Sequence, residues 1–190
     1  MCGRYYIAEE DQAEELRRII DEAQRRSTEA VKTGEIRPTD LAAVVANNRN
    51  GDKASFAMRW GYKLPKGLLI NARSEAAGDK PLFRDGMERR RCLVPASWYF
   101  EWEKRGKEKI KYAISPEGMS LTYLAGIYRV VSGVASFVIL TREAAPGIAF
   151  IHDRMPAILP KEMCHEWLDM RNDPREILAA CEERMTYRTA

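Results

Sequence analysis

The sequence predicts an α+β fold, with a single domain over residues 1–190 in which helices flank a mostly antiparallel, curved or barrel-like β-sheet. Strand-like stretches crowd the middle of the chain, whereas helical patterns lie near its two ends. The two kinds of segment do not alternate, as the βαβ units of a parallel sheet would require. The chain has 190 residues, of which 45% are hydrophobic, and this is enough for one sizeable core.

The N-terminal elements follow from short local patterns. RYYI at residues 4–7 predicts a strand. A helix is predicted over residues 8–30, because its apolar positions share one face and charge pairs four residues apart, such as Glu14 with Arg18, support it. The stretch KTGEIRPTD at residues 32–40 ends this helix.

The middle of the chain predicts a series of strands. Asn50 and Gly51 are a hairpin signal between two apolar stretches. The predicted strands are residues 41–46, 55–60, 91–97, 98–102, 110–115, 120–130 and 135–141.

Two helices are predicted near the C-terminal end. The first begins at Pro160, and its shared apolar face consists of Met163, Cys164, Trp167 and Leu168. The second covers residues 173–181, with Asp173 as the N-cap, Pro174 in the first turn and Glu176 three residues after the cap.

Composition and cysteine usage exclude several classes of protein. No apolar stretch approaches the ~20 residues that span a bilayer, and no signal peptide pattern is present. We therefore expect a cytoplasmic protein that does not bind a membrane. None of the four cysteines (Cys2, Cys92, Cys164 and Cys181) lies in a CxxC pair, and the chain has two histidines. We therefore expect no zinc site, no other metal, no cofactor and no disulfide.

The arginines are informative by their positions, because the net charge of +3 indicates no particular partner. Several lie beside aromatic or turn residues, and a basic stripe with aromatic residues is typical of a single-stranded nucleic-acid site. Arginines scattered over the surface would explain the pattern equally well. The residues concerned are Arg4, Arg59, Arg73, Arg89, Arg90, Arg91 and Arg154.

The stretch INARSEA places polar residues directly after an apolar one. Asn71 can donate and accept hydrogen bonds, and Arg73 can hold a phosphate in a bidentate manner. The same letters also fit a turn at Asn71 followed by a helix that starts at Ser74.

The stretch VPASWYFEW places a carboxylate in a strongly aromatic strand. Alternation puts Glu101 on the same face as Tyr99 and opposite Phe100 and Trp102. A carboxyl group in such surroundings is partly desolvated, which favours general acid–base use. The alternatives are a solvent-facing Glu101 on an amphipathic strand and, for Trp102, either a core ring or a stacking platform for a base.

The stretch FIHDRMPAIL interrupts two apolar runs with charged residues. His152 can move protons near neutral pH, and Asp153 can orient it or pair with Arg154. The alternative is a histidine that is satisfied within a turn. His165, in the predicted helix after Pro160, is interpreted as structural.

Cys2 carries two nucleophiles once Met1 is removed, and a residue as small as cysteine allows that removal. A free α-amine has a pKa of about 7.7–8.0, so roughly a tenth of it is neutral at pH 7. It can form a Schiff base with an aldehyde, after which the neighbouring thiol can add to the imine carbon and close a thiazolidine ring.

With these residues in view, the chain resembles the SOS response-associated peptidase family, which is also described as abasic-site processing proteins. The resemblance runs from Cys2 to about Leu168, and MCGRY, RWG, NARSE, RCLVPA, YFEW and HDRMP occur in the family's order. It implies a monomer that crosslinks itself to abasic sites in single-stranded DNA as part of the DNA damage response. It also implies peptidase character, in the sense that the residue before Cys2 is released.

The resemblance implies a role for each motif residue. Cys2 would be the nucleophile, Asn71 would orient the amine and the sugar, Glu101 would be the general acid–base, and His152 would assist proton transfer at the sugar oxygen. The phosphates beside the lesion would be held by Arg4, Arg73 and Arg154. The wall against which bases stack would be shaped by Trp60, Gly61 and Trp102.

Two other functions fit the same residues. In the first, the thiol of Cys2 attacks a carbonyl and its own amine is the base, as in an N-terminal-nucleophile cysteine peptidase or amidohydrolase. In the second, the protein is a non-covalent single-stranded DNA-binding module with reversible, salt-sensitive binding.

Overall fold

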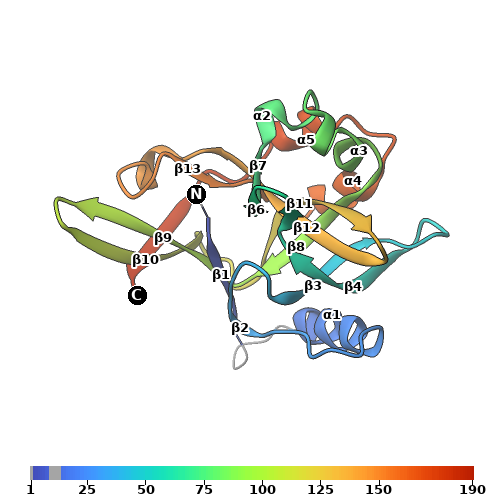
Figure 1. Ribbon diagram of the computed structural model, residues 1–190. Coiled ribbons are helices and arrows are strands. Elements are labelled where there is room, and N and C mark those ends of the chain that lie inside the picture. The colour runs from blue at the N-terminus through green and yellow to red at the C-terminus, as the bar shows by residue number, and fades with distance from the viewer. Residues whose placement is uncertain (1, 9–13) are drawn as a thin grey trace.

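A computed structural model describes residues 2–8 and 14–190, and five of the described strands close into a barrel (Figure 1). The barrel runs β12–β4–β3–β8–β11 and returns to β12, and every pairing in it is antiparallel except that of β12 with β4. Its strands are β3 (Leu41–Asn47), β4 (Lys53–Trp60), β8 (Arg91–Ala96), β11 (Thr122–Val131) and β12 (Val134–Glu143). The predicted α+β class with a mostly antiparallel, barrel-like sheet is confirmed.

Three short strands and a small hairpin extend the barrel. β7 (Asn71–Arg73) pairs in parallel with β12, and β13 (Arg154–Pro156) pairs with the C-terminal part of the same strand. Asn71 and Arg154 thus pair with the same strand, Asn71 opposite Ile139 and Arg154 opposite Glu143. The remaining additions are β14 (Ile158–Leu159), which pairs with β11, and the hairpin of β5 (Tyr62–Leu64) and β6 (Gly67–Leu69).

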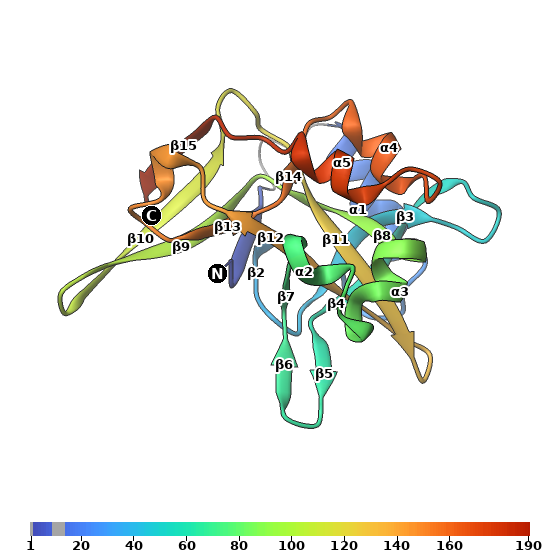
Figure 2. The same ribbon diagram turned by 90° about the horizontal axis from the view of Figure 1, so that it is seen from above.

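A second, five-stranded sheet packs against the barrel in the order β15-β10-β9-β1-β2. Its strands are β1 (Arg4–Ile7), β2 (Gly34–Ile36), β9 (Trp98–Arg105), β10 (Glu108–Pro116) and β15 (Met185–Thr189). Tyr5 pairs with Tyr99, and both side chains lie on the face that is buried against the barrel, here called the inner face. Arg4 pairs with Phe100 on the opposite, outer face. β9 and β10 extend well beyond the barrel (Figure 2).

The helices are shorter than the sequence predicts at the N-terminal end. α1 covers Glu14–Arg25 of the predicted 8–30, and residues 9–13 lie outside the described part of the chain. After the helix, the side chain of Gln24 makes the hydrogen bonds with backbone groups that a continued helix would make itself. Its Oε1 accepts the N–H of Val31 at 2.8 Å, and its Nε2 donates to the carbonyl of Glu29 at 3.1 Å.

The helices of the second half cover the barrel. The predicted N-cap Asp173 is confirmed, because its side chain accepts the N–H of Arg175. The elements are α2 (Ser74–Ala77), α3 (Pro81–Arg89), the 3₁₀ turn η1 (Pro146–Ile148), α4 (Met163–Leu168) and α5 (Pro174–Ala179). Within residues 2–8 and 14–190, no helix is both long and apolar enough to cross a membrane.

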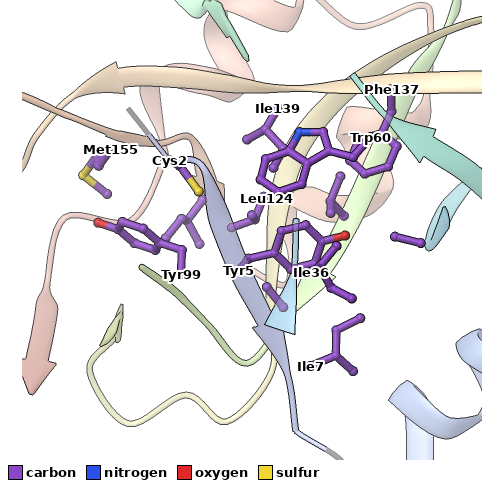
Figure 3. Packing of buried hydrophobic residues seen from close by; sticks show 14 of the residues in the cluster. Cys2, Tyr5, Ile7, Ile36, Trp60, Tyr99, Leu124, Phe137, Ile139 and Met155 are labelled. Atoms are coloured by element: carbon purple, nitrogen blue, oxygen red, sulfur yellow. The ribbon is translucent and has the colours of Figure 1, made fainter. Parts of the chain in front are cut away.

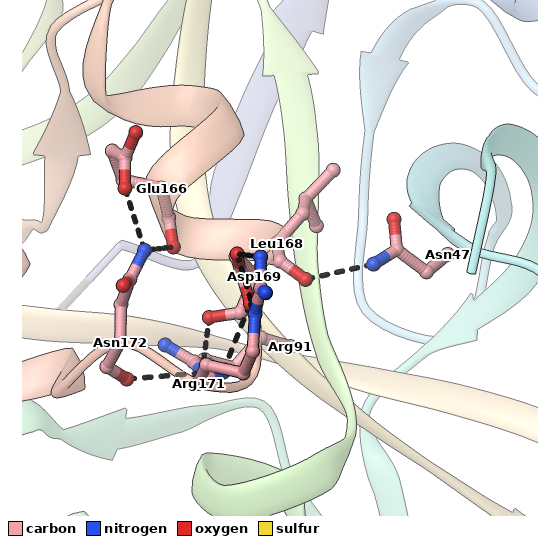
Figure 4. A network of polar contacts seen from close by, with 7 residues as sticks. All are labelled: Asn47, Arg91, Glu166, Leu168, Asp169, Arg171 and Asn172. Atoms are coloured by element: carbon pink, nitrogen blue, oxygen red, sulfur yellow. Dashed lines mark hydrogen bonds and ion pairs between the residues drawn. The ribbon is translucent and has the colours of Figure 1, made fainter.

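Arg91, one of the arginines considered for a basic stripe, is a structural residue. It is 1% exposed, and its Nη2 donates to the carbonyls of Asp169 and Asn172 at 2.9 and 3.2 Å (Figure 4). Asn47 similarly donates to the carbonyl of Leu168 at 2.8 Å. These bonds satisfy carbonyls at the end of α4 and in the turn after it, and they hold this part of the chain on the barrel.

Candidate active site

Cys2 lies in the core and is not a surface thiol. It immediately precedes β1, is fully buried, and belongs to the same packed cluster as Tyr99 and Met155 (Figure 3). Its Sγ donates to the carbonyl of Arg4 at 3.6 Å. Burial, followed by the nearby charge of Glu101, raises the pKa of this thiol. The sulfur is therefore protonated at neutral pH.

Asn71 holds the backbone of Cys2. Its Nδ2 donates to the Cys2 carbonyl oxygen at 2.9 Å, across 69 residues of chain. Its Oδ1 is buried and has no hydrogen-bond partner among the described residues. The interpretation of Asn71 as a turn residue is wrong, because it begins β7, whereas the helix start at Ser74 is confirmed. Pairing with β12 thus places the side-chain amide of Asn71 beside Cys2.

Glu101 faces the core on the inner face of β9. It is 4% exposed, so the alternative of a solvent-facing carboxylate is wrong and the expected desolvation is confirmed. Tyr99, two residues earlier, has a buried hydroxyl without a partner among the described residues. Burial, with the charges of Cys2 and Glu101 as further causes, raises the pKa of this phenol. The site therefore gathers a thiol, a carboxyl group and a phenol in surroundings that exclude water.

His152 lies just before β13 and is partly exposed. Its Nδ1 accepts the N–H of Arg154 at 3.0 Å and lies 2.8 Å from the Asp153 carboxylate. The Asp153 carboxylate and the backbone of Arg154 thus meet the same ring nitrogen, and together they orient the imidazole.

Arg154 is held by a carboxylate that the sequence analysis did not single out. Its two terminal nitrogens lie 2.7 and 2.9 Å from the oxygens of Glu75, and Nη2 also donates to the Thr141 carbonyl at 2.6 Å. The Arg154 side chain is 11% exposed. Its hydrogen bonds lower the pKa of Glu75. Arg73, at the end of β7, is exposed.

Arg4 and Trp102 form one unit on the outer face. The Arg4 guanidinium lies 5.2 Å from the centre of the Trp102 ring, and its Nη1 donates to Glu35 Oε1 at 3.1 Å. Trp102 is partly exposed and is therefore not a core ring.

Trp60 requires a correction. Its side chain is fully buried, its Nε1 donates to the Ile70 carbonyl at 3.0 Å, and its ring packs against Tyr5 and Phe137. The expectation that it offers a stacking face to a base is wrong, because the barrel core covers the ring.

The backbone conformation at position 61 favours glycine. Its φ of +110° disfavours other residues, and a Cβ there would lie 2.8 Å from Leu68 Cδ1. It lines a cavity of about 630 Å³ together with Arg59, Lys63 and Arg129, whereas none of the four predicted catalytic residues lines that cavity. Nothing in this geometry joins Gly61 to Cys2.

No group of three or more His, Cys, Asp or Glu residues in the described ranges forms a constellation that could hold a metal ion. The residues that come together are Cys2, Asn71 and Glu101, with Tyr99 as an addition that the sequence analysis used only to assign a face. Glu75 belongs to the same polar stretch as Asn71 and Arg73, but no role was predicted for it, although its place in the first turn of the helix after Arg73 was a usable signal.

Comparisons with known proteins identify the family to which the chain is similar. A model of the family described as SOS response associated peptidase (SRAP) matches residues 1–189. The abasic site processing protein YoaM of Bacillus subtilis (strain 168) is 31% identical over 203 aligned residues, which cover 94% of this chain and 83% of that protein. The abasic site processing protein YedK of Escherichia coli (strain K12) is 32% identical over 116 residues, 57% of this chain and 52% of that protein.

Solved structures share the fold. A phage-related protein of Bordetella bronchiseptica matches with a TM-score of 0.77 at 24% identity, covering 100% of this chain and 94% of that chain. A protein of Bacteroides thetaiotaomicron matches with a TM-score of 0.76 at 21% identity, covering 99% and 91%. At these identities the likeness extends to the architecture alone.

Proposed function

The chain belongs to the SOS response associated peptidase (SRAP) family, and from this premise we propose that it processes abasic sites in single-stranded DNA, as a monomer, through a covalent crosslink to Cys2. The observation that carries the proposal is the position of Cys2. Its carbonyl is held by Asn71, and its buried thiol lies within the field of the Glu101 carboxyl group. Relatives that carry the name of abasic site processing proteins support the substrate class.

The first step uses the amine of Cys2. It requires the removal of Met1, which lies outside the described residues. The amine nitrogen attacks the aldehyde carbon of the ring-opened abasic sugar, and the resulting carbinolamine loses water to give an imine. In this proposal, His152 assists proton transfer at the sugar oxygen, and Glu101 takes and returns the proton that the nitrogen loses.

The second step uses the thiol. The sulfur adds to the imine carbon, a C–S bond forms, and the thiol proton is transferred to the nitrogen. Because burial keeps the thiol protonated, this step needs a base close to the sulfur, and Glu101 is the group whose charge acts on that thiol. The product is a thiazolidine, and one water molecule is lost over the whole sequence.

The raised pKa of the thiol weighs against the peptidase alternative. A cysteine peptidase attacks with a thiolate, which is normally stabilised by a nearby cation or a helix N-terminus. Here burial and the Glu101 charge both disfavour the thiolate. The amine-first sequence does not need a preformed thiolate.

The proposal is tested by intact mass spectrometry of the purified chain before and after incubation with single-stranded DNA that contains one abasic site. We expect the first spectrum to show loss of Met1, and the second to show protein plus oligonucleotide minus one water, stable to heat. Reversible binding without a covalent product would favour the DNA-binding module. Turnover of peptide or amide substrates would favour the hydrolase.

Variants of the cysteine sharpen the test. Cys2→Ser should lose the heat-stable product, because a hydroxyl group does not close the thiazolidine, and Cys2→Ala should lose it as well. Cys181→Ala is the matched control, since it removes another buried thiol at the opposite end of the chain. If Cys2→Ala crosslinks as fast as the unchanged protein, the proposal is wrong.

A further inference from the structure

The outer face of the five-stranded sheet carries cations and aromatic rings in alternation. Strand register places the rings of Tyr6, Trp98, Phe100 and Trp102 on this face. Among the paired residues of the face, Glu35 is the one carboxylate. The positively charged residues on the outer face are Arg4, Lys104, Lys109, Lys111 and Arg188.

Each ring of β9 on this face seats a cation. Arg188 lies 4.9 Å from the centre of the Trp98 ring, and the Lys111 Nζ lies 3.8 Å from that of Phe100. The Arg4 guanidinium lies over the Trp102 ring in the same way. Since a strand rises about 3.3 Å per residue, the row from Trp98 to Trp102 is about 13 Å long. The rings fix three positive charges in a line, and each ring gives one face to its cation.

Glu35 holds two of these cations at the end of the row near Cys2. Its carboxylate accepts from Lys111 Nζ at 2.9 Å and from Arg4 Nη1 at 3.1 Å, and Arg37 binds it from the rim at 2.8 Å. Hydrogen bonding by Lys111, with a contribution from Arg37, lowers the pKa of Glu35. A phosphate oxygen could accept the same donors.

We infer that the outer face of β1, β9, β10 and β15 binds the phosphate backbone of the DNA strand next to the lesion, with Glu35 as an internal counter-anion that the strand displaces. The inference rests on the proposed function, because it places the flanking strand of the same substrate. The row begins at Arg4, two residues from Cys2. Its rings hold the cations in place and do not stack on bases, so binding is independent of base sequence.

The test measures the affinity for undamaged single-stranded oligonucleotides as a function of salt. Each phosphate contact on a single strand contributes about −0.7 to the slope of log K against log salt concentration. Lys111→Met and Arg188→Gln should each make the slope shallower by about 0.7, equally for dT and dA oligonucleotides. Glu35→Gln should tighten binding at low salt and steepen the slope. Lys80→Met is the control, because this exposed lysine precedes α3 on the barrel.

Unchanged slopes in both Lys111→Met and Arg188→Gln would overturn the inference, as would losses that depend on base identity. Weaker binding by Glu35→Gln would overturn the role of Glu35 as a displaced counter-anion. Arg188 is exposed on the edge strand β15, so its variant keeps the test valid if Lys111→Met does not fold.

Crosslinking of abasic DNA at saturating concentration is measured in parallel. A normal crosslink with unchanged slopes would refute only the backbone site, whereas altered slopes without any crosslink would refute only the covalent function.

Discussion

The two faces of the five-stranded sheet have opposite chemistry although the same strands make both. On β9, Glu101 is buried on the inner face, and its neighbour Trp102 lies beneath Arg4 on the outer face. The inner face has buried polar atoms and raised pKa values, whereas the outer face has partly exposed ion pairs. Since side chains alternate along a strand, a shift of one residue would exchange the two sets. Strand register is therefore what separates the reactive site from the cationic surface.

The energetics of the faces differ accordingly. Exposed ion pairs such as Arg4–Glu35 contribute about 0–1 kcal/mol each, so a phosphate can replace the carboxylate at little cost. A polar group on the inner face is desolvated, and a missing partner there costs about 1–3 kcal/mol. Substitutions on the inner face should therefore alter rate and stability, and those on the outer face should alter affinity and its salt dependence.

The largest effect is expected for Glu101→Gln, which keeps the shape of the side chain and removes its ability to move protons. The rate of adduct formation should fall by about 10²–10⁴, the usual contribution of general acid–base catalysis, while the salt dependence of DNA binding stays unchanged. Single-turnover crosslinking on denaturing gels measures the rate. Glu103→Gln is the control, because Glu103 lies on the same face but binds Arg105 and Tyr112. Equal losses in both variants would show that the inner face has no specific base.

The thiols provide the next test, because Cys2 reports whether water reaches the inner face and the other three cysteines serve as references. Burial raises the pKa of Cys181 to about 11 and that of Cys164 to about 12, and it raises those of Cys2 and Cys92 as well. At pH 8 the native protein should react with iodoacetamide on the order of 10²-fold more slowly than the unfolded chain, with Cys181 first. Mass spectrometry of digested samples gives the order.

The same shifts fix how stability depends on pH. The folded state keeps protons that the unfolded thiols release near pH 8.5, so the stabilisation is complete below that pH and declines as the pH rises toward the folded values. Rapid alkylation of Cys2 ahead of the other cysteines would contradict a dry inner face and would revive the peptidase interpretation.

Local signals in the sequence predicted local structure well. Asp173 predicted its helix because an N-cap acts within one turn, and the apolar stretches predicted the barrel strands. α3 was not predicted, although Pro81 and Phe83 suit a helix, and Gly86 within it has a low helix propensity. In the structure Gly86 packs closely against Ile127, because a Cβ there would lie 3.0 Å from that side chain. The parallel pairing of β12 with β4 depends on closing the barrel and has no local signal.

The candidate site was predictable only in part, because contacts that depend on the pairing of distant strands have no local signal in the sequence. The aromatic neighbours of Glu101 indicated its burial, but the same pattern also fitted a solvent-facing carboxylate, and only the packing of the sheet on the barrel decides between them. Trp60 was misjudged because the sequence does not distinguish a ring in the core from one on the surface. The contact between Asn71 and Cys2 spans 69 residues and depends on the pairing of β7 with β12. Lys111 and Glu35 likewise come together only through strand register.

A smaller effect is expected for Asn71→Ala, which leaves the Cys2 carbonyl without its donor. The free energy of unfolding should fall by about 1–3 kcal/mol, and crosslinking should slow by about tenfold because Cys2 loses a fixed position. Asn47→Ala is matched to it, since Asn47 also donates to a backbone carbonyl, that of Leu168, but on the barrel side. Chemical denaturation and crosslinking rates separate the two. A slower rate in Asn47→Ala as well would mean that lost stability alone explains the effect.

The smallest effect, and the sharpest, is expected for Tyr99→Phe. Because the Tyr99 hydroxyl is buried without a partner among the described residues, its removal breaks no hydrogen bond of the fold and relieves a desolvated group. The free energy of unfolding should stay within about 0.5 kcal/mol or rise by up to about 1 kcal/mol. Tyr5→Phe removes a second such hydroxyl from the same face and should give the same change in stability. If the Tyr99 hydroxyl meets the sugar during the reaction, crosslinking should slow by up to about tenfold in Tyr99→Phe alone, the worth of one hydrogen bond. A loss of stability in Tyr99→Phe would instead show that the hydroxyl supports the fold. Tyr99 would then not count among the reactive groups of the inner face, which would be Cys2 and Glu101.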